Sequence, residues 1–88
     1  MSSSVVSKPL DFVKLLLDCN VYIKLKGNRE ITGKLEGFDQ HCNCILSGAE
    51  ETITSISESN KISKDLNKSP MMFVRGDGIV MVAAELTN

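Results

Sequence analysis

The stretch Val21-Tyr-Ile-Lys-Leu25 decides the fold, because its apolar and polar side chains alternate strictly. A period of two predicts a half-buried β-strand, with one face toward a core and the other toward solvent. Gly27-Asn28 then supplies a turn, and residues 31–35 resume the alternation as a second strand. Gly33 and Gly37 fall inside this strand pattern, which indicates strong bending.

A short helix is predicted before the strands, over residues 9–18. Pro9 suits the first turn of a helix, Asp11 suits its positive end, and Ser7 is a candidate cap. So short a helix is not stable alone, so we expect it to cover the open face of the sheet. Its apolar side would carry Leu10, Val13 and Leu17.

After the second strand, Cys42, Cys44 and Leu46 share one face of a predicted third strand, whose apolar character extends to Ile53. Residues 55–69 are polar and predict a flexible loop that contains the ragged ends of two strands. The lysines of this loop could contact RNA phosphates, although exposed charge more often marks a solvated loop.

Two apolar strands, residues 71–74 and 79–84, surround Gly76-Asp77-Gly78. Asp-Gly between apolar runs is typical of a β-hairpin, so we expect these strands to form one. Both are apolar on both faces, and such strands are either covered on both sides or buried in a subunit interface. In so short a chain the interface is the more attractive explanation.

Length and charge limit what the chain can do. Its 88 residues predict one domain over residues 9–84, between tails at 1–8 and 85–88. The net charge of −1 argues against a clamp on duplex DNA but permits the reading of a few single-stranded bases. We recognise no signal peptide and no apolar run long enough to span a membrane. Three cysteines without an export signal indicate reduced thiols in an intracellular protein.

Planar and polar side chains gather at Asp39-Gln-His-Cys-Asn43. If the strand includes this segment, Asp39, His41 and Asn43 point one way and both cysteines the other. His41 then offers a flat surface for stacking a base, and the Asn43 amide offers a donor beside an acceptor, which matches the edge of uracil. Asp39 could accept the spare Asn43 N–H and orient the amide. The alternative interpretation is a polar turn, since Asp and Asn bond readily to local backbone.

Arg75 and Gly76 stand where the fourth predicted strand ends. A guanidinium can stack on a base and donate hydrogen bonds, and a glycine allows close approach of a backbone. If the fold brings this segment to His41 and Asn43, the side chains form a nucleobase site. The alternative is a surface arginine beside a turn.

Neither a metal site nor a catalytic site is predicted. His41, Cys42 and Cys44 could supply three ligands, but the strand pattern puts His41 opposite the thiols, and structural zinc needs four ligands. An Asp39–His41 pair could in principle cleave RNA, yet no nucleophile motif, second carboxylate or metal cluster accompanies it. We therefore expect a binding protein rather than an enzyme, with no cofactor.

Two motifs together resemble the Sm and Sm-like (Lsm) family of RNA-binding proteins, over residues 9–84. The first motif runs from the alternating strand through Gly33-Lys-Leu35 to Asp39-Gln-His-Cys-Asn43 and Cys44-Ile-Leu46. The second is Phe73-Val74 followed by Arg75-Gly76-Asp77 and the apolar residues Ile79 to Val82. Both occur in the family's order and at its usual separation.

The resemblance implies an N-terminal helix on a five-stranded, strongly bent antiparallel sheet, the small open barrel of the Sm fold. It implies a uridine slot in which His41 stacks on the base, Asn43 reads its edge, and Asp39 braces Asn43. Arg75 would close the other side of the slot, with Gly76 beside it. The resemblance also implies rings in which the fourth strand of one subunit pairs with the fifth strand of the next.

Partners are implied by the same resemblance. It implies other Lsm subunits in a hetero-oligomeric, heptameric ring, and U-rich RNA as the ligand. The RNA would be the 3′ end of U6 snRNA in nuclear pre-mRNA splicing, or mRNA 3′ ends together with decay factors in the cytoplasm. An isolated chain is expected to close a homo-oligomeric ring, because each subunit owns both edges. No membrane partner is expected.

Two alternatives within this family stay open. One is a core Sm subunit of spliceosomal particles, although such subunits usually carry a longer, more basic loop before the fourth strand. The other is an assembly subunit whose own slot is rarely occupied, with its neighbours holding the RNA.

Overall fold

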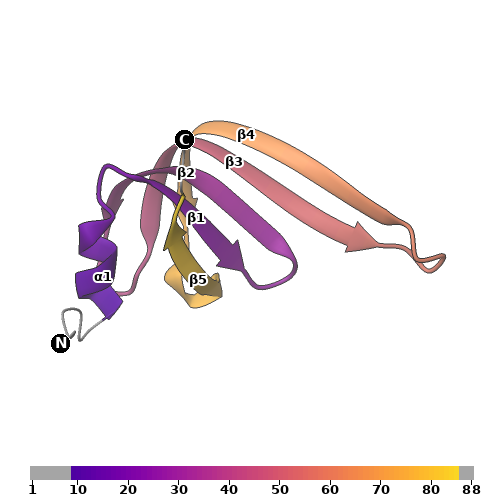
Figure 1. Ribbon diagram of the computed structural model, residues 1–88, viewed down its shortest axis with the longest axis horizontal. Coiled ribbons are helices and arrows are strands. Elements are labelled where there is room, and N and C mark those ends of the chain that lie inside the picture. Colours follow the sequence, from indigo (N-terminus) through magenta and orange to yellow (C-terminus); the bar gives the residue numbers. More distant parts are fainter. Residues whose placement is uncertain (1–8, 86–88) are drawn as a thin grey trace.

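The computed structural model describes residues 9–85 and is mostly β, as the sequence predicts. A helix, five strands and a 3-10 turn follow one another along the chain (Figure 1): α1 (Pro9–Leu15), β1 (Asn20–Leu25), β2 (Arg29–Phe38), β3 (Cys44–Ile56), β4 (Ile62–Val74), η1 (Gly76–Gly78) and β5 (Ile79–Ala84). The turn expected at Gly27-Asn28 joins β1 to β2. The candidate cap Ser7 and the predicted tails, apart from Glu85, lie outside the described residues.

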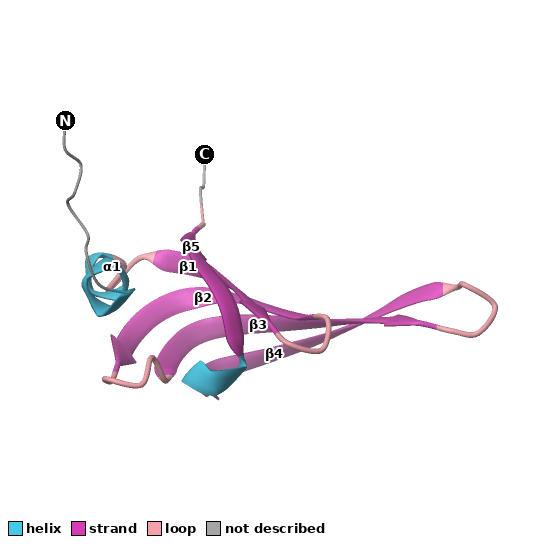
Figure 2. Cartoon of the chain, turned by 90° about the horizontal axis from the view of Figure 1, so that it is seen from below, coloured by secondary structure: helices cyan, strands magenta, loops and turns pink. Residues whose placement is uncertain are grey.

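The strands form one antiparallel, five-stranded sheet in the order β4-β3-β2-β1-β5. β5 pairs with β1, with Val21 opposite Ala84, so β4 and β5 are the two opposite edges. The β-hairpin predicted between β4 and β5 is therefore wrong. The sheet curls so strongly that the end of β4 lies near the start of β5, and η1 connects the two edges (Figure 2). Lys26 N–H donates to the Gly78 carbonyl at 2.9 Å, which anchors η1 to the β1–β2 turn.

Two register shifts between β2 and β3 accompany the bend. One occurs at Gly33 and the other just before Gly37, so the bending expected at these glycines is confirmed. β3 passes close to Gly33, where a Cβ would lie 3.0 Å from Ser47 O and 3.2 Å from Ala49 Cα. Gly48 is one of the two β3 residues opposite Gly33, and its φ is +55°. A left-handed glycine of this kind is typical of a β-bulge, which increases the local twist.

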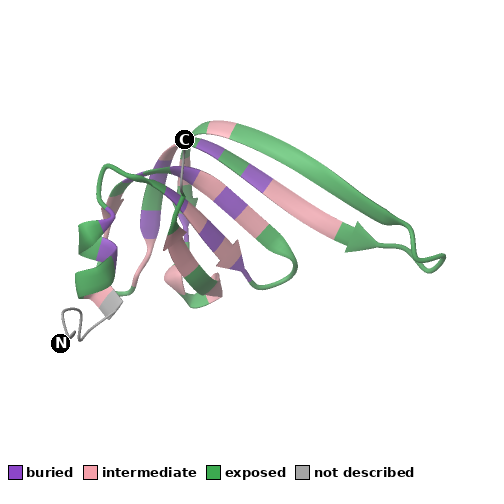
Figure 3. Ribbon diagram, viewed as in Figure 1, coloured by how far each residue is buried: buried purple, intermediate pink, exposed green. Residues whose placement is uncertain are grey.

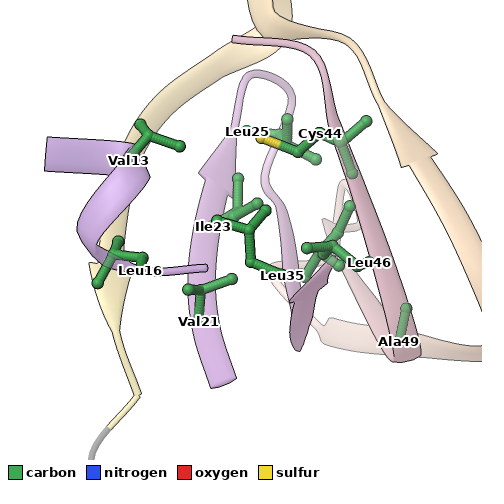
Figure 4. Packing of buried hydrophobic residues seen from close by; sticks show 11 residues of the cluster. Val13, Leu16, Val21, Ile23, Leu25, Leu35, Cys44, Leu46 and Ala49 are labelled. Atoms are coloured by element: carbon green, nitrogen blue, oxygen red, sulfur yellow. The ribbon is translucent and has the colours of Figure 1, made fainter. Parts of the chain in front are cut away.

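The core lies on the inner face of the curved sheet, where every second side chain is buried (Figure 3). Leu46 and Cys44 of β3 pack there with residues of β1, β2 and α1 (Figure 4). Fully burying an aliphatic side chain of this size contributes about 1.5–3 kcal/mol. The apolar positions predicted from the alternation are all buried: Val21, Ile23, Leu25, Ile31 and Leu35.

α1 packs against one end of this core and is shorter than predicted. It ends at Leu15, and the next three residues form a turn. The turn buries Leu16 beside Val13 and leaves Leu17 exposed, whereas the sequence predicts Leu17 on the buried side. Backbone hydrogen bonds to Leu35 of β2 explain the early end, because they draw the chain after the helix into the sheet.

β3 and β4 extend beyond the rest of the sheet as a two-stranded hairpin (Figure 1). The loop predicted over residues 55–69 is therefore wrong in extent, because pairing continues to Ile56 opposite Ile62 and only residues 57–61 form the turn. Ser57 N–H donates to the Lys61 carbonyl at 2.8 Å and closes this turn. Polar residues suit the hairpin, because its faces are largely exposed while its backbone groups pair across the strands.

A polar cluster fastens the base of the hairpin to β2. Glu51 of β3 is only 9% exposed, and its Oε2 accepts a hydrogen bond from Arg29 Nε at 2.9 Å within an ion pair. Asn67 Nδ2 of β4 donates to Glu51 Oε1 at 3.4 Å. These contacts join three neighbouring strands, and they compensate a carboxylate that burial alone would disfavour.

Candidate nucleic-acid interface

Residues 39–43 form a tight turn between β2 and β3 rather than a continuation of the strand. Asp39 builds this turn, because its Oδ1 accepts hydrogen bonds from the backbone N–H groups of His41 and Asn43, at 2.8 and 3.1 Å. Cys42 has a φ of +62°, so the alternation of strand side chains does not apply to this segment. The predicted alternative, a polar turn, is correct here, and the turn leaves His41 exposed.

Asn43 connects the two segments that the sequence singles out. Its Nδ2 donates to Asp39 Oδ2 at 2.9 Å, which confirms that Asp39 orients the amide. Its Oδ1 accepts a hydrogen bond from the Gly76 N–H at 2.7 Å, across 33 residues of sequence. One Nδ2 hydrogen and one lone pair of Oδ1 remain for a ligand.

Gly76 lies so close to the 39–43 turn that no side chain fits. A Cβ at this position would stand 1.9 Å from the His41 carbonyl oxygen and 2.8 Å from the carbonyl carbon of Cys42. The close approach expected of this glycine is therefore present, and the backbone that it approaches is that of the other segment. Glycine is required here because two loops meet, not because of an unusual φ.

Arg75 extends from the end of β4 into solvent, with 75% of its side chain exposed. Its Nη2 donates to Asp77 Oδ2 at 2.9 Å. Sequence reasoning missed Asp77 as a site residue, although an acid two positions after an arginine, with glycine between them, was a visible signal. An exposed ion pair of this kind contributes about 0–1 kcal/mol, so a ligand can displace it at little cost.

The two loops enclose an open cavity of about 460 Å³, lined by His41, Asn43, Arg75, Gly76 and Asp77. Four of the five residues singled out from the sequence therefore line one cavity. The fifth, Asp39, stands behind Asn43 and acts on the cavity through that amide. An imidazole, an amide and a guanidinium converge here, which is a combination that can stack on a base and bond to its edge.

The Asp39 carboxylate is held in its charged form. The Asn43 amide and the His41 N–H donate to it, and these bonds keep the pKa of Asp39 below its ordinary value. The pKa of Cys44 shifts in the other direction: burial raises the pKa of its thiol to about 11. Cys44 is therefore a protonated core thiol at neutral pH, in agreement with the inward orientation expected for it.

Among residues 9–85, no three His, Cys, Asp or Glu side chains gather in a way that could hold a metal ion. In the same part of the chain, α1 is too short to cross a membrane.

The edge strands carry exposed apolar side chains near the cavity end of the sheet. Met71 and Phe73 of β4 are 55% and 62% exposed, and Val80 and Met81 of β5 are 59% and 46% exposed. Of the two explanations that the sequence allows for these strands, coverage within the chain does not hold for these four side chains. Exposed apolar clusters of this kind mark protein–protein contact surfaces.

The sequence matches the LSM domain family over residues 11–84. It is 41% identical to the LSM complex subunit lsm3 of Schizosaccharomyces pombe, over 93% of this chain and 94% of that protein. It is 40% identical to the Sm-like protein LSM3B of Arabidopsis thaliana, over 94% and 90% of the two chains. The probable U6 snRNA-associated Sm-like protein LSm3 of Dictyostelium discoideum is 37% identical, over 92% and 89%.

Solved structures of Sm proteins share the fold. The Pyrococcus abyssii Sm protein, solved in complex with a uridine heptamer, has a TM-score of 0.69 and 28% identity, over 90% of this chain and 100% of that one. The P. aerophilum SmAP1 heptamer has a TM-score of 0.72 and 27% identity, over 93% and 99%.

Within the family, this sequence resembles the third Lsm subunit of eukaryotes, above all in Pro70-Met-Met-Phe-Val-Arg-Gly-Asp-Gly78. The LSM3 names of these relatives agree with that resemblance. The two motifs, the sheet that they build and relatives of matching length all agree with the family match. This chain therefore belongs to the LSM domain family.

Proposed function

We propose that the chain is a non-catalytic subunit of a heptameric Lsm ring that binds U-rich single-stranded RNA. The observation that carries this proposal is the hydrogen bond between Asn43 and Gly76, which brings the His41 turn and the Arg75 loop around one open cavity. The Pyrococcus abyssii Sm protein, solved with a uridine heptamer, supports uridine as the ligand.

A uracil base would lie between the His41 ring and the Arg75 guanidinium. Stacking of this kind contributes about 1–3 kcal/mol per base. The remaining donor and acceptor of Asn43 fit the carbonyl and N3–H of uracil. Asp39 takes no part in contact with the base, and its charged carboxylate keeps the amide in one orientation. Arg75 would release Asp77 as it closes on the base.

One slot binds a single base weakly, so a ring is required for useful affinity. β4 and β5 lie at opposite edges of the same sheet, so each subunit can receive one neighbour and offer itself to another. Slots repeated around a ring turn later bases into intramolecular contacts, which can raise affinity by about 10²–10⁴-fold. The P. aerophilum SmAP1 heptamer supports a ring of this type.

Two cellular settings are included in the proposal. In the nucleus, a ring with other Lsm subunits would hold the 3′ end of U6 snRNA for splicing, and the name of the Dictyostelium relative supports this setting. In the cytoplasm, a ring would hold mRNA 3′ ends together with decay factors. The isolated chain would close a homo-oligomeric ring, because both of its edges are compatible with another copy.

Native mass and RNA binding test the proposal together. The purified chain should run as a closed oligomer, and fluorescence anisotropy should show tighter binding of oligo-U than of oligo-C. His41→Ala and Arg75→Ala should each weaken oligo-U binding by about 1–3 kcal/mol per slot without changing the native mass. Lys34→Ala, an exposed change on β2, is the control and should bind as the unchanged protein does.

Three results would count against this function. Unaltered affinity in both His41→Ala and Arg75→Ala rings would favour an assembly subunit whose slot stays empty. RNA cleavage by the purified chain, abolished by Asp39→Ala, would favour an enzyme. Recovery from cell extract of spliceosomal RNAs other than U6 would favour a core Sm subunit.

A further inference from the structure

The two edges of the sheet differ in length. β4 has thirteen residues and β5 has six. In the ring proposed above, on which this inference rests, subunits join through these edges. β5 of a neighbour can then cover only about half of β4. We place that contact at the end of β4 next to η1, where Met71 and Phe73 are exposed and the neighbouring residues contain no charge. Pro70 has no N–H to donate and separates this end from residues 62–69.

Residues 62–69, the outer half of β4, therefore keep an open backbone edge. On their other side they pair with β3 as far as Ile56 opposite Ile62. They form one side of the hairpin that extends away from the body of the molecule (Figure 1). An open strand edge is a template on which another extended segment can add.

One face of the outer half alternates apolar and basic side chains: Ile62, Lys64, Leu66 and Lys68. Ile62 and Leu66 are 66% and 57% exposed, and Ile56, opposite Ile62 on β3, is 64% exposed. The face points away from the core, because the intervening residue Asn67 is the one that reaches inward to Glu51. Large exposed aliphatic side chains at regular spacing mark a protein contact rather than a solvated surface.

This face carries more basic than acidic charge. Lys64 stands opposite Thr54 and Lys68 opposite Glu50 of β3, so two lysines face one carboxylate. Among residues 9–85, the ion pairs are Arg29–Glu51 and Arg75–Asp77, and neither includes these lysines. Asp65, the acid nearest to them in β4, belongs to the opposite face by alternation. At the body end, Glu50 and Lys68 border a shallow cavity of about 380 Å³ with room for a further side chain.

The geometry points to a second binding site on this chain: the outer half of β4 accepts an extended acidic and apolar segment of a partner protein as an added strand. Apolar residues of the partner lie against Ile62 and Leu66, and its carboxylates lie beside Lys64 and Lys68. RNA suits this surface less well, because residues 62–69 contain no aromatic side chain on which a base could stack.

A designed peptide tests the site on the full chain in its assembled form. The probe is the capped peptide Val-Thr-Glu-Thr-Val-Thr-Glu, and its match is the same peptide with both Glu replaced by Lys. Binding is followed by NMR titration, and amide hydrogen exchange locates the protected strand. We expect the acidic peptide to bind at least about tenfold more tightly than the basic one, since opposite charges across a strand pair attract and like charges repel. Protection should fall on residues 62–69.

Two protein variants complete the experiment. Lys64→Glu with Lys68→Glu should lose binding of the acidic peptide about tenfold and gain the basic one, while native mass and oligo-U affinity stay unchanged. Lys26→Glu with Lys34→Glu makes the same change of charge on exposed positions outside the hairpin and should leave peptide binding unchanged.

Several outcomes would overturn the site. Equal binding of the two peptides, or no binding of either, would contradict it. So would protection confined to residues 71–74. A loss of oligo-U affinity in the Lys64→Glu, Lys68→Glu variant would make the face an RNA contact instead. Failure of the ring is seen separately. A monomeric native mass would contradict the ring, and the peptide titration on that monomer would still decide for or against the strand site.

Discussion

At the scale of single residues, Asn43 holds the candidate site together. Its amide is fixed at both ends, by the Asp39 carboxylate and by the Gly76 N–H. A rotation of the amide by half a turn would break both bonds, so its donor and acceptor meet a ligand in one order only. In the pose proposed above, uracil donates its N3–H to Oδ1 and accepts the Nδ2 hydrogen on a carbonyl, whereas cytosine has an unprotonated N3 at the matching position. The fixed amide would therefore favour uracil in that pose.

Asn43→Ala should raise the pKa of Asp39 toward its ordinary value, because the amide is the largest of the influences that lower it. Since the pKa of Asp39 is lowered in the folded chain, its bonds stabilise the turn fully above about pH 4. They are lost as the pH falls through the folded value. NMR of the Asp39 carboxyl carbon during an acid titration measures the change. Gln40→Ala, which removes no bond to Asp39, is the control, and an equal Asp39 titration in all three proteins would contradict the assignment.

Gly76→Ala should destabilise the fold and weaken RNA binding together. The added Cβ would collide with the His41 carbonyl, and relieving such overpacking costs about 1–3 kcal/mol. Gly37→Ala is the matched control, because nothing lies within 4 Å of a Cβ at Gly37. Denaturant midpoints at one protein concentration report the stability. Equal midpoints for the two variants would mean that the loops separate easily.

Among the elements, the β3–β4 hairpin depends on a polar cluster at its base. Glu51→Ala should lower the free energy of unfolding by about 1–3 kcal/mol, because it removes bonds to a charged group and leaves the Arg29 and Asn67 side chains without their acceptor. Glu50→Ala, one residue away on the exposed face, should change stability by less than about 0.5 kcal/mol. Urea unfolding with an unchanged slope measures both, and equal losses would show that the cluster is not the anchor.

The elements also show how far sequence reasoning reaches. The core of β1 and β2 could be predicted, because the period of two is dictated by strand geometry itself. The ends of β3 and β4 could not, because backbone hydrogen bonds pair residues 62–69 with β3 whatever their side chains are. The partner of β5 was also missed, since Asp-Gly signals a local turn and says nothing of a pairing with β1.

The candidate site was predicted through residue chemistry rather than through backbone geometry. Imidazole, amide and guanidinium groups suit a base wherever they stand, so His41, Asn43 and Arg75 could be named without the structure. The sequence left open whether residues 39–43 are part of a strand or form a polar turn. The structure has the turn, in which Asp39 bonds to the turn backbone as well as to the Asn43 amide. Asp77 was missed although its position two residues after Arg75 was visible, because whether the two side chains pair depends on how η1 folds.

At the scale of the whole molecule, the exposed apolar ends of β4 and β5 should govern assembly. Phe73→Glu should lower the native mass of the purified chain toward that of a monomer while circular dichroism keeps its strand signal, because the side chain is 62% exposed and supports no core. Leu66→Glu is the control: Leu66 is similarly exposed, at 57%, but lies in the outer half of the same strand, so the native mass should stay unchanged. A reversed result would move the subunit contact to the hairpin.

The pairing of β5 with β1 has a consequence for synthesis. β1 is synthesised first but can pair with β5 only after nearly the entire described chain has been made. Arg75 is synthesised just before β5, so a nascent chain has neither the complete sheet nor the complete cavity until then. A ring joined through β5, as proposed above, can therefore form only after this strand has emerged, and until then the edge of β1 stays unpaired and open to other chains.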